Sequence, residues 1–137
     1  MAFRLTSHVE AERNAQIQDA RMQRILLRSG VCWTAIDHGH TFDKTLGRHG
    51  KPIGLIEAQK RKARGVRAGI PDFLYWHQGR GYAIERKVAG GVISDEQKQF
   101  QAELVEAGIP VAVCWTQKEI CDALEGWGLL RQYKAIA

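Results

Sequence analysis

Two acidic residues lie in apolar stretches of the sequence, where a charged side chain is costly to bury. Asp72 stands in GIPDFLYW, between a proline and four bulky apolar residues, and Glu85 stands in the later stretch GYAIERKV. A buried carboxylate needs a partner that compensates its charge. Two carboxylates held together share either a proton or a cation, because both cannot stay ionised and unpaired at short distance. The pair therefore indicates a site with its own chemistry.

A β-hairpin would bring the two acids together. The stretches DFLYW and GYAIERKV are rich in aromatic and β-branched residues, and the HQGR between them contains the glycine of a tight turn. With the turn centred on Gln78 and Gly79, antiparallel pairing places Asp72 opposite Glu85. The Cβ atoms of directly opposed residues are about 4.5–5.5 Å apart. The spacing thus predicts two adjacent carboxylates.

Lys87 is expected to join the acids, because residues two apart on a strand project from the same face. Two interpretations of this group remain open. In the first, the lysine neutralises the acids in a structural ion-pair cluster, although one ammonium group cannot balance two carboxylates. In the second, the carboxylates bind Mg²⁺ or Mn²⁺, with water and a backbone carbonyl as further oxygen ligands.

A metal ion in such a site would suit phosphodiester hydrolysis. A bound divalent cation lowers the pKa of water, polarises a phosphoryl oxygen and stabilises the leaving oxygen. Hydrolysis of a phosphodiester needs all three effects. Lys87 would then orient the attacking water or stabilise charge on the pentavalent phosphorus.

Basic residues concentrate in one third of the chain. Residues 44–87 contain eleven lysines and arginines and three acids, a net charge of +8, whereas the rest of the chain carries −3. Such a footprint fits a polyanion, with nucleic acid as the first candidate; a solvated basic helix is the alternative. The residues predicted to bind DNA are Lys60, Arg61, Lys62, Arg64 and Arg67.

Helical and strand patterns alternate around these residues. We expect helices at residues 9–28, 55–63, 94–108 and 117–128, strands at 31–36, 72–76, 81–88 and 111–115, and an irregular exposed loop at 37–54. This order predicts an α/β fold with a mixed β-sheet flanked by helices, in which the hairpin is antiparallel and the β-α-β portion gives a parallel pair. At this length, a single domain spanning residues 1–137 is expected.

Composition excludes several classes of protein. No apolar run approaches the roughly 18–20 residues of a membrane span, and the N-terminal residues lack the apolar core of a secretory signal. The three cysteines, Cys32, Cys114 and Cys121, have no CxxC spacing and are expected to be reduced core residues. These features predict a cytoplasmic protein without membrane partners.

The residues around the two acids resemble a known signature. The PD that ends at Asp72 and the ERK at residues 85–87 are similar to the PD-(D/E)xK motif of the restriction-endonuclease-like superfamily. With G-x-R-x-G before the PD and S-x-x-Q opening the following helix, the string GVRAGIPDFLYW…GYAIERKV…ISDEQKQFQAELVEAGIPVAVC resembles the VRR-Nuc (virus-type replication-repair nuclease) family. The resemblance covers residues 65–114 well and the first helix only weakly.

This resemblance implies a metal-dependent endodeoxyribonuclease with a restriction-endonuclease-like core in the order α-β-β-β-α-β. It implies that Asp72 and Glu85 bind Mg²⁺ (or Mn²⁺) with the backbone carbonyl of Arg86, that Lys87 is the catalytic lysine, and that Gln97 is an active-site glutamine. Short stand-alone members resemble Holliday-junction resolvases that act as homodimers, so branched DNA in a bacterial or phage-infected host cell is the expected setting. The alternative is a non-catalytic nucleic-acid-binding module that retains the nuclease fold.

Two positions carry a second interpretation. Gln97 also completes a capping box with Ser94, because S-D-E-Q is the pattern in which the first and fourth side chains cap a helix. Many members of the superfamily place an acid on the first helix, and Asp19 is the best candidate for it, with Gln16 and Gln18 nearby where related sequences carry an acid. This additional ligand stays open.

Other chemistry-bearing residues fit structural roles better. His38, His40 and His49 share a loop with Asp43, but the four lack a recognised zinc-ligand spacing. The four tryptophans lie in or beside expected strands and a helix, where packing is the commoner use and base stacking the alternative; they are Trp33, Trp76, Trp115 and Trp127.

Overall fold

The protein, analysed as a computed structural model, forms an α/β fold over the described residues 2–38, 50 and 52–132. The elements are α1 (Ala2–Leu26), β1 (Cys32–Ala35), α2 (Ile53–Ala63), β2 (Phe73–His77), β3 (Arg80–Arg86), α3 (Asp95–Glu106), β4 (Val111–Cys114) and α4 (Gln117–Gly126). The mixed sheet flanked by helices confirms the predicted fold class, and its order agrees with a restriction-endonuclease-like core.

The four strands lie in the order β1-β2-β3-β4. β1 and β2 are antiparallel, β2 and β3 form the antiparallel hairpin, and β3 and β4 are parallel. Trp76 pairs with Gly81 across the hairpin, as predicted. The turn residues Gln78 and Gly79 both have positive φ, 50° and 74°, which matches the right-handed twist of the strands they connect.

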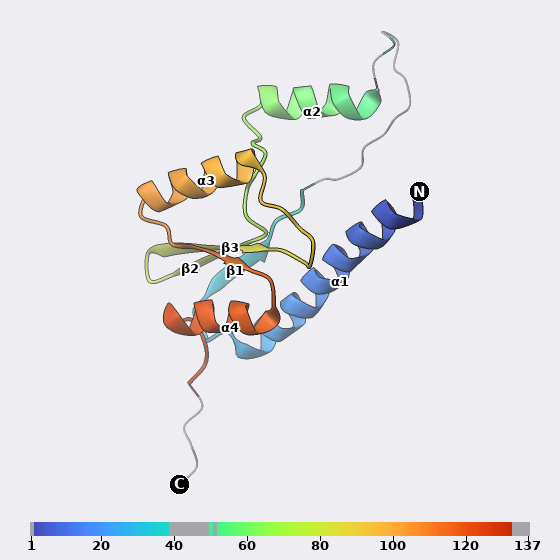
Figure 1. The fold of residues 1–137 in the computed structure, drawn as a ribbon. Coiled ribbons are helices and arrows are strands. Elements are labelled where there is room, and N and C mark those ends of the chain that lie inside the picture. Colours follow the sequence, from blue (N-terminus) through green and yellow to red (C-terminus); the bar gives the residue numbers. More distant parts are fainter. Residues whose placement is uncertain (1, 39–49, 51, 133–137) are drawn as a thin grey trace.

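Alternation along the strands separates an apolar face of the sheet from the face that carries the acids. Phe73 and Ile84 are fully buried and join a core cluster with Ile120 and Leu124 of α4. Each such side chain stabilises the fold by about 1.5–3 kcal/mol. α1 and α4 lie on this side of the sheet, and α3 lies over the other (Figure 1). Glu85 follows Ile84, so its carboxylate projects toward α3.

Most predicted boundaries agree with the structure to within two residues, and the starts of two helices need comment. α1 begins at Ala2 rather than at residue 9, since residues 2–8 contain no glycine or proline to interrupt a helix. α2 begins at Ile53, inside the predicted loop, directly after the cap residue Pro52. The fixed φ of proline suits a helix start. The rest of that loop, residues 39–49 and 51, lies outside the described residues.

α1 carries a polar stripe along one face. Glu12, Gln16, Asp19 and Gln23 recur at spacings of four, three and four residues, which places them on one side of the helix. Asp19 and Gln23 are fully buried, and Gln23 accepts a hydrogen bond from the hydroxyl of Tyr75 on β2. The stripe therefore faces the sheet. In the described part of the chain, no helix is both long and apolar enough to cross a membrane.

α2 stands apart from the sheet, beyond α3 (Figure 1). Among its described residues only Gly54 is buried. The helix ends in the basic run Lys60, Arg61 and Lys62. Basic side chains near the C-terminus of a helix interact favourably with its dipole, so local electrostatics contribute to the stability of a helix that has little packing of its own.

Candidate active site

Asp72 and Glu85 lie at the open end of the β2–β3 hairpin. Phe73 pairs with Ile84, so the same register continued by one residue places Asp72 opposite Glu85. The two acidic residues are only 7% and 2% exposed. Pro71 is fully buried and cannot donate to the sheet, which suits a residue just before a strand. The structure thus brings together the two acids that the hairpin spacing predicted.

Glu85 lies in an unfavourable electrostatic environment. Burial and the negative charge of Asp72 raise the pKa of Glu85 to about 8, and the ammonium of Lys87 opposes the shift. Oε1 of Glu85 accepts a hydrogen bond from Nε2 of Gln97 at 2.9 Å and lies 3.6 Å from Nζ of Lys87. Within the described residues, no donor reaches the buried Oε2. An acceptor without a donor, beside a second carboxylate, is a position that a cation can fill.

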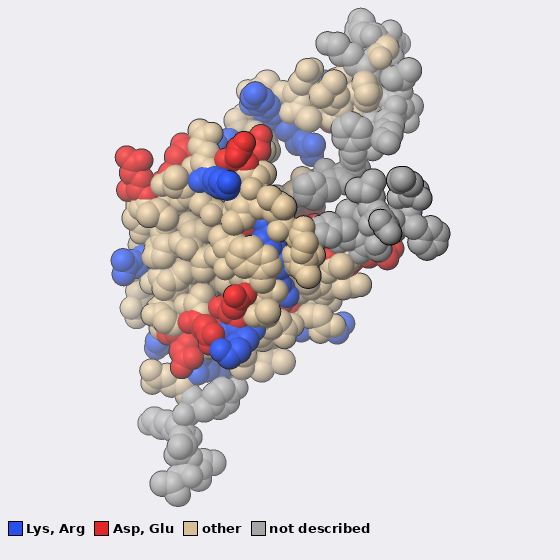
Figure 2. Space-filling model, in the orientation of Figure 1, with Lys and Arg blue, Asp and Glu red and all other residues tan. Residues whose placement is uncertain are grey.

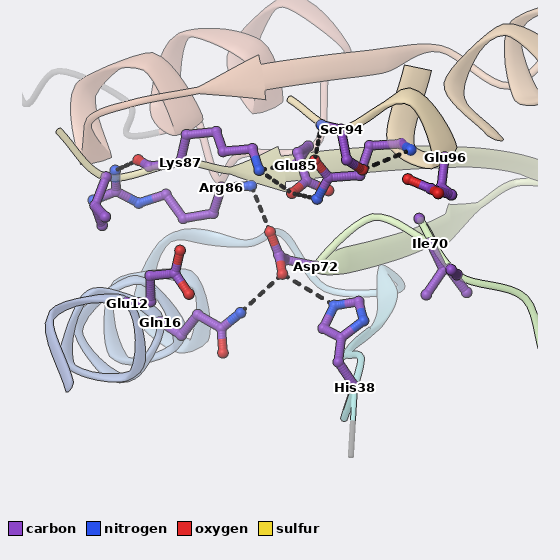
Figure 3. Close-up of a pocket in the computed structure, with 14 residues that line it drawn as sticks. Glu12, Gln16, His38, Ile70, Asp72, Glu85, Arg86, Lys87, Ser94 and Glu96 are labelled. Atoms are coloured by element: carbon purple, nitrogen blue, oxygen red, sulfur yellow. Dashed lines mark hydrogen bonds and ion pairs between the residues drawn. The ribbon is translucent and has the colours of Figure 1, made fainter. Parts of the chain in front are cut away.

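Asp72, by contrast, has three hydrogen-bonding partners from three parts of the fold (Figure 3). Its Oδ2 accepts from the backbone N–H of Arg86 at 2.8 Å. Its Oδ1 accepts from Nε2 of Gln16 on α1 at 3.0 Å and lies 3.1 Å from Nε2 of His38, which follows β1. These contacts fix the carboxylate where α1, β3 and the end of β1 meet.

Lys87 is anchored on the same side of β3 as Glu85. It follows β3 directly and is 7% exposed. Nζ donates to Oε1 of Gln97 at 2.9 Å and to the backbone oxygen of Val92 at 3.1 Å. Because Gln97 also binds Glu85, one amide group connects the lysine with the acid. The common face that alternation predicted for Glu85 and Lys87 is confirmed.

Gln97 joins this site to the beginning of α3. Oγ of Ser94 accepts from the N–H of Gln97 at 3.1 Å, and Oε1 of Gln97 accepts from the N–H of Ser94 at 2.9 Å. This reciprocal pair is the predicted capping box. The same Oε1 receives the Lys87 ammonium. Both sequence interpretations of Gln97 therefore describe contacts that occur together in the fold.

Gly69 brings the segment before Asp72 against the first turn of α3. Its φ is +88°, in the region that favours glycine, and a Cβ at this position would lie 2.7 Å from the backbone nitrogen of Gln97. Any larger residue would therefore meet the backbone of α3 as well as an unfavourable φ. The glycine of the G-x-P-D pattern thus has a physical cause, because the segment that leads to Asp72 passes directly against the backbone of α3 at Gln97.

The side chain of Arg86 points away from this group, toward α1. Nε donates to Oδ2 of Asp19 at 2.7 Å. Burial raises the pKa of Asp19, while the hydrogen bond and charge of Arg86 lower it. Asp19, the best first-helix candidate for an additional site acid, is thus engaged with Arg86, and it does not line the pocket around Asp72.

Four residues that were not predicted to join Asp72 and Glu85 also line that pocket. Glu12 and Gln16 line it from α1, and His38 and Glu96 line it from other segments (Figure 3). The signal for the first two was the polar stripe of α1, since polar residues at i and i+4 on a helix packed against a sheet must face something polar. His38 had no comparable signal, because its partner is Asp72, 34 residues away.

Four of the five basic residues predicted to bind DNA lie at the end of α2. Lys60, Arg61 and Lys62 form its last turn and Arg64 follows as its C-cap. Lys60 lies 3.6 Å from Glu57 in an exposed i,i+3 pair. Figure 2 shows basic side chains on this projecting helix. We refer to residues 60–64 as the α2 basic cluster.

Arg67, the fifth predicted DNA-binding residue, lies against α3 instead. Its guanidinium lies 4.5 Å from the centroid of the Phe100 ring and forms an ion pair with Glu103. A guanidinium over an aromatic face is attracted by the ring quadrupole. The structure therefore separates Arg67 from the α2 basic cluster and attaches it to the helix that begins at the site.

The predicted core cysteines and tryptophans differ in their burial. Cys114 is buried as expected, but Cys32 is exposed, because it lies on the outer strand β1 opposite Trp76, which is itself 45% exposed. Trp33 packs against Phe73, as expected for a structural tryptophan.

Trp127 likewise packs against Tyr82, whereas Trp115 is exposed. Of the four residues of the zinc alternative, only His38 is described, and it contacts Asp72. His40, His49 and Asp43 lie outside the described residues.

The donor set at the hairpin end fits a hard divalent cation. Two buried carboxylates face one another, one of them with an oxygen that no donor reaches in the described structure. Oxygen ligands of this kind are preferred by Mg²⁺ and Mn²⁺. Nowhere in the described residues do three His, Cys, Asp or Glu side chains group as a metal centre. The two carboxylates are therefore the centre of the candidate metal site, and Glu12 lines the same pocket from α1.

Comparison with known proteins identifies a family. A family model described as the VRR-NUC domain matches residues 12–118, more than three quarters of the chain. The matched region extends from the pocket residue Glu12 through Asp72, Glu85 and Lys87 to the start of α4. No curated protein and no solved structure matches the chain.

Proposed function

The chain belongs to the VRR-NUC family of nucleases, and on this basis we propose that it is a divalent-metal-dependent endodeoxyribonuclease that cuts branched DNA such as four-way junctions. The observation that carries the proposal is the buried group of Asp72, Glu85, Lys87 and Gln97. Ionisation of both buried carboxylates is unfavourable in the metal-free protein, and a bound cation offsets that cost.

Asp72, Glu85 and the backbone carbonyl of Arg86 would hold Mg²⁺ or Mn²⁺. When bound, the ion would supply Lewis acidity toward a phosphoryl oxygen and a lowered pKa for bound water. Glu85 must lose its proton to act as a ligand, because a protonated carboxyl is a poor one. Asp72 is already oriented by Gln16 and Arg86, which reduces the reorganisation that binding requires.

Lys87 would stabilise the charge that develops on the phosphoryl group during hydrolysis. Its Nζ lies beside the carboxylate pair and is oriented by Gln97. A preorganised cation in a partly dry site is more effective there than in water. Gln97 would act by holding the lysine and Glu85 in place, so its effect on the substrate is indirect.

Substrate binding would rest on the α2 basic cluster. Its cationic side chains, of which Lys60, Lys62 and Arg64 are exposed, suit sequence-independent contacts with the phosphate backbone, which release counterions on binding. We propose a homodimer as the active form, because two-fold symmetry matches a four-way junction in which two strands are cut alike.

A cleavage panel tests this function directly. Four-way junctions, flaps, splayed arms and plain duplex are incubated with the protein in Mg²⁺, Mn²⁺ or EDTA, and sedimentation measures its oligomeric state. We expect metal-dependent cutting, greatest for branched forms, that Asp72→Ala and Lys87→Ala abolish while DNA binding is retained. Cutting by Asp72→Ala at the wild-type rate would refute the proposed site. Salt-sensitive DNA binding without metal binding or cutting would instead identify a non-catalytic binding module.

A further inference from the structure

We propose that the ion pair between Asp19 and Arg86 is a positioning device for the Glu85-Arg86-Lys87 segment, built from two side chains that bond to one another behind β3. The effect of this device on catalysis rests on the proposed nuclease function. Its effect on the position of the backbone does not. It assigns a role to the side chain of Arg86 and to a buried acid that does not line the pocket.

The guanidinium of Arg86 connects three elements that meet behind the site. Nε donates to Asp19 on α1 at 2.7 Å. Nη1 donates to the backbone oxygen of Lys87 at 2.7 Å and also to that of Trp115, just after β4. One rigid, planar group therefore fixes the end of β3 relative to α1 and to the end of β4. A lysine could not make these contacts together, because its ammonium is a single point donor on a flexible stem.

These contacts restrain consecutive peptide groups around the proposed ligand carbonyl. The N–H of Arg86 is held by Asp72 at 2.8 Å, and the N–H of Lys87 is held by the carbonyl of Cys114 at 2.8 Å. Because a trans peptide is planar, fixing the N–H of Lys87 also fixes the direction of the Arg86 carbonyl. The next carbonyl, that of Lys87, is held by the Arg86 side chain.

The ion pair is expensive to bury, which argues that it does more than fill space. Asp19 is fully buried and the Arg86 side chain is 10% exposed. Apolar residues of similar volume often replace a buried ion pair without loss of stability. Arg86 lies two residues after Ile84 of the apolar core cluster and so on the same face of β3, so apolar residues would be compatible with this face. The guanidinium supplies what they cannot, namely donors directed at two backbone carbonyls.

A double substitution separates positioning from stability. In Asp19→Val/Arg86→Met both charges are removed together, so we expect the protein to fold, with a urea midpoint somewhat below that of the wild type because two backbone carbonyls lose their donor. Asp19→Val alone leaves a buried guanidinium unpaired and is expected to unfold at lower urea. The exposed pair of Lys118 and Asp122 on α4, replaced by two alanines, serves as the matched control.

Hydrogen exchange of the Arg86 amide is the decisive measurement, because this proton reports whether the segment still meets Asp72. We expect it to exchange at least tenfold faster in the double variant than in the wild type. The Ala83 amide on the same strand, which donates to the carbonyl of Pro110, should keep its protection. Unchanged Arg86 exchange in the double variant would overturn the inference.

Kinetics supply the second readout. In the double variant we expect kcat to fall at least tenfold with KM for DNA within twofold of the wild-type value, and we expect the Lys118/Asp122 control to keep both. Wild-type kcat in the double variant would also overturn the inference. If the wild-type protein cuts no DNA, the proposed function fails, and the exchange measurement still decides whether the ion pair positions the segment.

Discussion

The backbone N–H of Arg86 donates to Oδ2 of Asp72 across 2.8 Å, so a side chain joins β2 and β3 one residue beyond their last backbone pair. With this bond on Oδ2 and the contacts of Gln16 and His38 on Oδ1, both carboxylate oxygens of Asp72 have hydrogen-bonding partners. Glu85 has no such support on Oε2 and has a pKa of about 8. In the metal-free protein, Glu85 is therefore the member of the pair that holds a proton near neutral pH.

We predict that the metal-free protein loses stability as the pH rises from about 4.5 to about 8. The folded state keeps the proton on Glu85 through this window, because its pKa is raised from 4.5 to about 8, whereas the unfolded chain releases it near pH 4.5. The folded state binds more protons, so the free energy of unfolding falls by up to about 1.4 kcal/mol per pH unit from this group. Urea unfolding in EDTA at several pH values measures the slope.

Glu85→Gln is the matched control for that experiment. Glutamine keeps the shape of the side chain and an acceptor for Gln97 but does not titrate. Its slope over the same pH window should be smaller than that of the wild type, and it should be the more stable protein at pH 8. Identical slopes for the two proteins would contradict the raised pKa of Glu85.

Binding of Mn²⁺ at pH 7 is predicted to release about one proton, because Glu85 must ionise to become a ligand. Titration calorimetry in two buffers of different ionisation enthalpy measures the release. Glu85→Gln should bind weakly and release none, whereas Lys118→Ala, altered on the exposed face of α4, should behave as the wild type. Tight binding that depends on Glu85 but gives the same heat in both buffers would rule out this linkage.

The cap and the site contacts of Gln97 are predicted to be separable by substitution. Gln97→Glu retains a capping-box residue at this position but loses the donor to Glu85 and adds a negative charge. We expect the helix cap to persist and kcat to fall at least tenfold, equivalent to about 1.4 kcal/mol.

Ser94→Ala is the complementary variant, since it removes the hydroxyl of the cap and leaves Gln97 intact. It should cost about 1 kcal/mol of stability and preserve most of kcat. Urea unfolding and cleavage rates of the two variants are compared side by side. If Ser94→Ala lowers kcat as much as Gln97→Glu does, Gln97 affects catalysis only by capping α3, and its contacts with Lys87 and Glu85 have no separate effect.

Local sequence signals were sufficient to predict the hairpin and its register. Gln78 and Gly79 adopt the positive φ values of a two-residue turn, and such a turn leaves little freedom in the pairing of the strands it joins. The alternation that follows then places Asp72, Glu85 and Lys87 on one face. The capping box was equally local, because Ser94 and Gln97 are three residues apart.

Contacts between distant segments could not be predicted in the same way. Gln16 meets Asp72 across 56 positions of sequence, and Arg67 meets Glu103 across 36. Nothing near Arg67 distinguishes an arginine that binds phosphate from one that pairs with a helix. The docking angle of α1 on the sheet decides which of Gln16 and Asp19 reaches the pocket, and that angle depends on packing across the whole core.

Gly69→Ala is predicted to be costly because Gly69 has two constraints. The positive φ costs roughly 1–2 kcal/mol for a residue with a Cβ, and the clash with the backbone of α3 adds about 1–3 kcal/mol. Gly90 has a similar φ, +83°, and open space around its Cβ position, so Gly90→Ala carries only the first cost. Urea unfolding measures the loss of stability in the two variants. Equal losses would show that α3 shifts at little cost to accommodate the added methyl group.

The α2 basic cluster and Arg67 are predicted to differ in the salt dependence of DNA binding. Replacing Lys60, Arg61, Lys62 and Arg64 by glutamine should weaken binding and reduce the slope of log Kd against log salt by about 0.9 for each phosphate that these side chains neutralise. Arg67→Gln should leave that slope nearly unchanged and lower stability instead, because Arg67 is engaged with Glu103 and Phe100. Fluorescence anisotropy across a salt series measures both slopes, with Lys118→Gln as the control for an exposed charge on α4. A larger change of slope for Arg67→Gln than for the fourfold variant would contradict this assignment. It would mean that a DNA phosphate replaces Glu103 as the partner of Arg67, and that Arg67 contributes more to DNA binding than α2 does.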